Sequence, residues 1–114
     1  MEIEFQKKWD DLKRHLDQRF EDDLDVQAIL FLIGLQELGK KVEKLSKDQK
    51  VDVMHVAVCA ILEPYGYYEY EGRDKDDWPH WKSAKQLPRL NQREQEMLMK
   101  QGIIEYLEEN STFA

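Results

Sequence analysis

Cysteine is nearly absent from this sequence, since Cys59 is the only one among 114 residues. A single cysteine cannot form a disulfide within the chain, and it excludes a zinc site built from several thiolates. At this length, one hydrophobic core suffices to hold a domain together without such cross-links. We therefore expect a folded protein that resides in a reducing cytoplasm.

Long apolar stretches are also missing. Uninterrupted apolar stretches such as Ala28 to Ile33 are far shorter than the roughly 18–20 residues that a membrane-spanning helix needs. The first residues, Met1 to Glu4, lack the basic and apolar segments of a secretory signal. We expect neither export nor a membrane partner.

Positive charge is in deficit, because the net charge of the chain is −7. Binding to nucleic acid relies on cations that neutralise phosphates, so we expect no nucleic-acid partner. Two local basic runs, within Lys40 to Lys50 and within Lys82 to Arg93, are interpreted as solvated faces that also cap helix ends.

Apolar residues at helical spacing are abundant. Steps of three and four join Phe5, Trp9, Leu12, Leu16 and Phe20, which predicts an amphipathic helix over residues 4–20. The acidic residues at 21–25 precede a second helix over 24–39, with Gly39 as its C-cap. Capping-box spacing in Ser46/Gln49 and Asn91/Glu94 predicts helices over 47–63 and 91–109.

These patterns predict a mainly all-α fold, with four helices in a single domain over residues 1–109 and a frayed tail at 110–114. The two central helices are almost entirely apolar, which predicts burial on most sides. The four valines between Val51 and Leu62 favour a strand, but the length of the stretch favours a helix. Surplus apolar surface on these two helices predicts a homodimer interface.

The segment 64–90 lacks helical spacing and begins at Pro64, which ends the third helix. We expect a long, ordered, aromatic-rich loop. A competing interpretation pairs Tyr67–Tyr70 with Trp78–Lys82 as a short β-hairpin around residues 72–77, in which Pro79 restricts the second arm to an edge.

A polar stripe follows the third helix, where Asp52, His55, Cys59 and Glu63 recur at steps of three and four. One hypothesis is a ligand or metal site formed by His55, Cys59 and Glu63 with His80 of the loop, the metal being undetermined. Another makes His55 a general base for a Cys59 nucleophile. The structural alternative, which we favour, is that His55 makes one hydrogen bond and Cys59 packs as a small hydrophobic residue.

Aromatic residues are concentrated in the loop. Tyr67, Tyr70, Trp78 and Trp81 form a candidate binding surface for a protein partner, a cation or a flat ligand. The alternative, which we favour, is that the rings pack as a lid over the helices, because a long loop must bury something to stay ordered.

Two further acidic patterns predict no metal site. Asp74, Asp76 and Asp77 alternate as in a calcium loop, but position six from Asp74 is Pro79, so a solvated turn is favoured. Acidic residues precede histidine by three positions at His55 and His80, as in di-iron proteins. In di-iron proteins, however, the acid is glutamate, and in this chain Pro79 interrupts the pattern that ends at His80.

No glycine-rich phosphate loop and no catalytic motif with a local signature is present. We therefore expect a non-catalytic, cytoplasmic protein-interaction protein, present as a homodimer, with an unidentified protein partner and no cofactor. The alternative is a metal-binding or small-molecule enzyme, or a ligand-binding protein, that uses the polar stripe and the aromatic loop.

Overall fold

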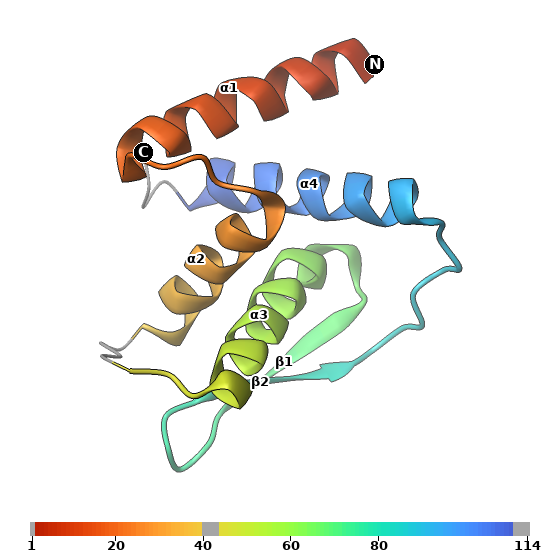
Figure 1. Cartoon of the computed structure of the whole chain (residues 1–114). Coiled ribbons are helices and arrows are strands. Elements are labelled where there is room, and N and C mark those ends of the chain that lie inside the picture. The colour runs from red at the N-terminus through yellow and green to blue at the C-terminus, as the bar shows by residue number, and fades with distance from the viewer. Residues whose placement is uncertain (1, 40–43, 111–114) are drawn as a thin grey trace. The chain divides into compact units, whose positions relative to one another are not determined.

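Two compact units make up the computed structural model, which describes residues 2–39 and 44–110. The chain up to Val26 and from Leu90 onward forms the first unit, with α1 (Glu2–Phe20) and α4 (Gln92–Glu109). Residues 27–89 form the second, with α2 (Val26–Leu38), α3 (Lys47–Leu62), the 3₁₀ turn η1 (Glu63–Tyr65), β1 (Tyr68–Arg73) and β2 (Pro79–Ser83). The mainly helical character is confirmed (Figure 1). The single domain over residues 1–109 stays a prediction.

In the first unit, α1 and α4 contact each other and run in the same direction (Figure 1). Arg93 Nη2 lies 3.1 Å from Glu2 Oε1 near the start of both helices, and Lys100 Nζ lies 5.1 Å from the centre of the Trp9 ring. The predicted capping box at the start of α4 is confirmed, because Asn91 and Glu94 exchange side-chain-to-backbone hydrogen bonds of 2.8 and 3.0 Å.

The end of α1 explains why α2 begins two residues later than predicted. Glu21 adopts a left-handed conformation with φ of 54°, and Asp22 N–H donates to the carbonyl of Asp17 at 3.1 Å, which closes the helix. The N–H of Leu24 then donates to the Asp17 carboxylate at 2.9 Å. Hydrogen bonds to Asp17 thus fix the backbone between the two helices, and Val26 is the first residue of α2.

In the second unit, α2 and α3 approach closely at Gly34. A Cβ atom built on Gly34 overlaps the carbonyl oxygen of Val53, so a side chain at this position would require the backbone to shift. Gly34 and Val53 are both buried, with Val53 fully inaccessible. The contact of the two helices therefore depends on the missing side chain at position 34.

The predicted bounds of α3 are nearly correct. Ser46 and Gln49 form the capping box, with hydrogen bonds of 3.1 and 2.9 Å. The helix ends at Leu62 and not at Glu63, because Pro64 lies in the 3₁₀ turn that follows. Burial is less complete than predicted for this helix, since Asp52 and His55 are exposed on its surface.

The segment 64–90 is not a loop throughout, and the competing hairpin interpretation is confirmed with a longer first strand. β1 and β2 pair antiparallel, with Tyr70 opposite Trp81 and Gly72 opposite His80, so that Glu71 forms a bulge. The bulge and Gly72, with φ of 105°, let the first arm continue to Arg73. Pro79 is the first residue of β2, where its missing N–H costs no ladder bond. Both strands contact α3.

Arg73 ties the hairpin to the end of α2. Its guanidinium donates to the carbonyl oxygens of Leu38 at 2.9 Å and Glu37 at 2.7 Å, and also to that of Asp77 at 2.8 Å. The carbonyls at a helix end lack partners in the helix and carry partial negative charge, so a cation there is stabilising. Gly39, with φ of 69°, ends α2 as predicted.

Some predicted features lie outside the described residues, and others stay predictions. Lys40 and Lys41, and the tail beyond Asn110, lie outside the described residues. Large exposed apolar side chains occur in four different described segments, at Ile3, Val51, Tyr70 and Leu87. The homodimer stays a prediction. None of the helices over residues 2–39 and 44–110 has the length and apolar content needed to cross a bilayer.

Substitution of Gly34 by alanine tests the helix contact. Alanine gains about 1 kcal/mol of helix propensity over glycine, whereas overpacking against a backbone oxygen costs about 1–3 kcal/mol or more. We expect a net decrease of about 1–2 kcal/mol in the free energy of unfolding, measured by urea denaturation. Gln27→Ala, on the exposed surface of the same helix, is the control. A Gly34→Ala variant as stable as the parent would refute the contact.

Candidate binding groove on α3 and the hairpin

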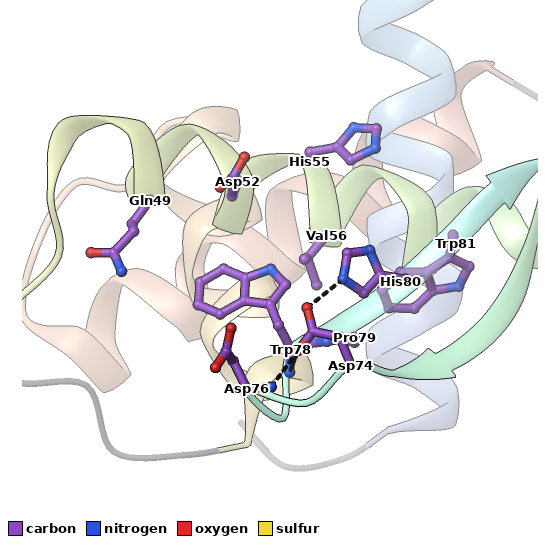
Figure 2. Close-up of a pocket in the computed structure, with 10 residues that line it drawn as sticks. All are labelled: Gln49, Asp52, His55, Val56, Asp74, Asp76, Trp78, Pro79, His80 and Trp81. Atoms are coloured by element: carbon purple, nitrogen blue, oxygen red, sulfur yellow. Dashed lines mark hydrogen bonds and ion pairs between the residues drawn. The ribbon is translucent and has the colours of Figure 1, made fainter.

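A groove of about 450 Å³ lies between the first half of α3 and the hairpin, and we call it the hairpin groove. From α3 it is lined by Gln49, Asp52, His55 and Val56. The turn and β2 contribute Asp74, Asp76, Trp78, Pro79, His80 and Trp81. Figure 2 shows the indole of Trp78 between α3 and Asp76 in the view chosen. All these residues belong to the second unit.

The carboxylate of Asp74 organises the turn that forms one wall of the groove. Its Oδ1 accepts hydrogen bonds from the backbone N–H groups of Asp76 at 2.8 Å and Trp78 at 3.0 Å. Its Oδ2 accepts one from Nε2 of His80 at 2.7 Å (Figure 2). Backbone bonds from Asp74 N–H to Trp78 and from Asp77 N–H to Asp74 close the same turn. The position of Trp78 in the groove therefore depends on one side chain.

The same hydrogen bonds stabilise the charged form of Asp74. The bond from His80, and after it the bonds from the backbone N–H groups, lower the pKa of the Asp74 carboxyl to about 2. The positive φ of Asp77, 62°, is the conformation that lets the chain turn back into β2.

Trp81 is fixed at the other end of the groove. Its indole N–H donates to Glu63 Oε1 at 2.7 Å, and its ring packs against Tyr70 on the paired strand, with ring centres 5.2 Å apart. Edge and tilted contacts of this kind between aromatic rings are stabilising. The end of α3 and the hairpin are thus joined through one tryptophan.

His55 and Cys59 contact each other, as their helical spacing predicts. Cys59 Sγ lies 3.4 Å from His55 Nε2, and the edge of Tyr68 meets the imidazole at a ring separation of 6.1 Å. Cys59 has no accessible surface, and this burial raises the pKa of its thiol to about 11. A protonated, inaccessible thiol is a poor nucleophile, so the geometry does not fit the hypothesis that Cys59 attacks a substrate.

Of the four residues of the hypothetical ligand site, His55 and Cys59 contact each other, whereas Glu63 and His80 have partners outside the set. His55 contacts Cys59, Glu63 accepts from Trp81, and His80 donates to Asp74. His55 and His80 both line the hairpin groove, but their rings do not point toward one another (Figure 2). Over the described residues, no group of three or more His, Cys, Asp and Glu side chains is placed to hold a metal ion.

The four residues of the candidate aromatic surface are also divided. Trp78 and Trp81 line the hairpin groove, whereas Tyr70 lies against Trp81 and borders an adjoining hollow that Trp81 also lines. Tyr67 lies elsewhere, with Lys85 Nζ 4.5 Å from its ring centre. Neighbouring residues of a strand point to opposite faces, which separates rings that are close in sequence.

Sequence reasoning missed the role of the aspartates. The sequence places Asp52 in the polar stripe and three positions before His55, and it predicts a solvated turn at Asp74 and Asp76, yet all three line one groove. The available signal was the pattern Asp74-x-Asp76 just before Trp78, because an aspartate that begins a tight turn bonds to backbone N–H groups two or more residues later.

Comparisons of this chain with models of known protein families, with curated proteins and with solved structures find no match.

The hydrogen bonds to the Asp74 carboxylate predict a lowered pKa that a pH titration can measure. The folded protein holds the pKa of this carboxyl below its ordinary value of 3.8, so its contribution to stability is complete above that pH and is lost as the pH falls through about 2. In His80→Leu, which removes the hydrogen-bond donor, the midpoint of the Asp74 carboxyl carbon resonance should shift upward, because the His80 bond is the largest cause of the lowered pKa. Equal midpoints in the two proteins, measured by NMR, would contradict the assigned hydrogen bond.

The burial of Cys59 predicts slow thiol chemistry. At pH 8 the native protein should react with a disulfide reagent at least about 100 times more slowly than the urea-unfolded chain, because a pKa near 11 leaves little thiolate. The rate is measured by the absorbance of the released thiol. Reaction of the native protein at the unfolded rate would show that the thiol is accessible.

Proposed function

We propose that this protein is a non-catalytic binding protein and that the hairpin groove is the place where a protein partner docks. The single observation that carries the proposal is the groove itself, with the half-buried indole of Trp78 held at its centre. Tryptophan is the residue type most enriched among those that dominate binding energy at protein interfaces.

The construction of the groove supports this proposal. Its volume of about 450 Å³ lies in the range typical of binding pockets. Val56 and Pro79 provide buried apolar contacts at its base, while the Asp74 bonds hold the turn in place before any partner arrives. A preformed site reduces the loss of conformational freedom on binding.

Neither Asp74 nor Cys59 is suited to acid–base catalysis near neutral pH. Acid–base catalysts are generally tuned toward neutral pH. Here the pKa of Asp74 is lowered to about 2 and that of Cys59 is raised to about 11, both away from neutrality. The homodimer and the cytoplasmic location are part of the proposal on sequence grounds alone, through the apolar central helices and the single cysteine.

Selection from a random peptide library displayed on phage, with the folded protein as bait, tests the proposed docking site. Enriched peptides should shift the indole N–H resonance of Trp78, and Trp78→Leu should weaken their binding at least about tenfold, as for a residue that dominates an interface. Affinities are measured by fluorescence anisotropy.

Tyr67→Leu is the matched control, because Tyr67 is a half-buried aromatic residue of the same segment outside the groove. It should leave the affinities unchanged. Peptides that bind equally well to Trp78→Leu, or a selection that enriches none, would argue against docking in the groove.

A further inference from the structure

The hairpin groove has a strongly unequal distribution of charge. Three carboxylates line it, those of Asp52, Asp74 and Asp76, and none of its described lining residues is lysine or arginine. A concave surface lined by one sign of charge concentrates the field and attracts the opposite sign. The groove thus favours a cation over a neutral or anionic group.

The three carboxylates differ in what they already bind. Asp74 is occupied by His80 and by two backbone N–H groups. The carboxylate of Asp52, which is exposed on α3, makes no hydrogen bond or ion pair within the described part of the chain. Asp52 stands on the helix side of the groove and Asp76 on the turn side, so carboxylates line both elements that form it.

Trp78 adds a second attraction for the same kind of ligand. The face of an indole ring is the strongest aromatic partner for a cation, and a guanidinium group also stacks on it. Carboxylates beside an aromatic face therefore favour a lysine or arginine side chain, whose methylene groups pack on the apolar part of the groove while the charged end meets the aspartates.

We infer that the hairpin groove recognises a basic side chain, arginine or lysine, on a segment of a protein partner. This inference rests on the proposed function and specifies its partner. An apolar segment in the same place would remove water from Asp52 without giving it a partner, which is unfavourable. An acidic segment or a nucleic acid would meet like charge.

A set of short capped peptides tests the inference. One contains arginine, the second lysine, and the third citrulline, which has the shape of arginine without its charge. We expect the arginine peptide to shift the Trp78 indole resonance in ¹⁵N NMR titrations, and the citrulline peptide to bind at least about tenfold more weakly, or about 1.4 kcal/mol. The lysine peptide should bind better than the citrulline peptide.

Two matched double variants separate the groove from the general negative charge of the chain. Asp52→Asn with Asp76→Asn should weaken arginine-peptide binding about tenfold, whereas Glu4→Gln with Glu71→Gln, exposed and outside the groove, should change it less than about twofold because exposed charges are largely screened beyond a Debye length. Circular dichroism melts confirm that both variants are folded.

Three outcomes would overturn the inference: citrulline and arginine peptides that bind equally, equal effects of the two double variants, or shifts that map outside the groove. If phage-selected uncharged peptides bind in a Trp78-dependent manner while the arginine peptide does not, the inference fails and the proposed function stands. If no peptide of either kind binds at Trp78, both fail.

Discussion

The close approach of α2 and α3 at Gly34 is the constraint on which the second unit depends. With no side chain at this position, the backbone of α2 lies against the carbonyl of Val53, and Val53, Val56 and Ala57 of α3 are buried. Asp52 and His55 then remain at the surface, on the part of α3 that faces the hairpin groove. A larger residue at 34 displaces α3 from α2, and with it one wall of the groove.

The other wall is held by polar bonds in addition to the packing of Trp81 on Tyr70. Asp74 fixes the backbone of the turn through two N–H groups, Arg73 joins that turn to the end of α2, and Glu63 holds Trp81 against the end of α3. Each of these partners is charged, and hydrogen bonds to charged groups are stronger than neutral ones. The groove therefore has a rigid wall although the sheet beside it has only two strands.

Local signals in the sequence predicted local structure well. The capping boxes at Ser46 and Asn91 are confirmed because both partners lie three residues apart, and the contact between His55 and Cys59 follows from helical spacing. Spacing did not predict that Glu63 bonds to Trp81, eighteen positions away, or that Arg73 bonds to Leu38, thirty-five positions away. Such pairs depend on where the hairpin packs, which hydrophobic periodicity does not encode. The groove was missed for this reason.

The guanidinium of Arg73 also sets an order for assembly. Its bond to Asp77 closes only a tight turn, and hairpins of this kind form within about 1–10 μs. Its bonds to Leu38 and Glu37 close loops of about 35 residues, which costs more chain entropy and requires that α2 already end at Gly39. During folding the turn therefore comes first and its attachment to α2 second. A fragment containing only the hairpin would lack this anchor.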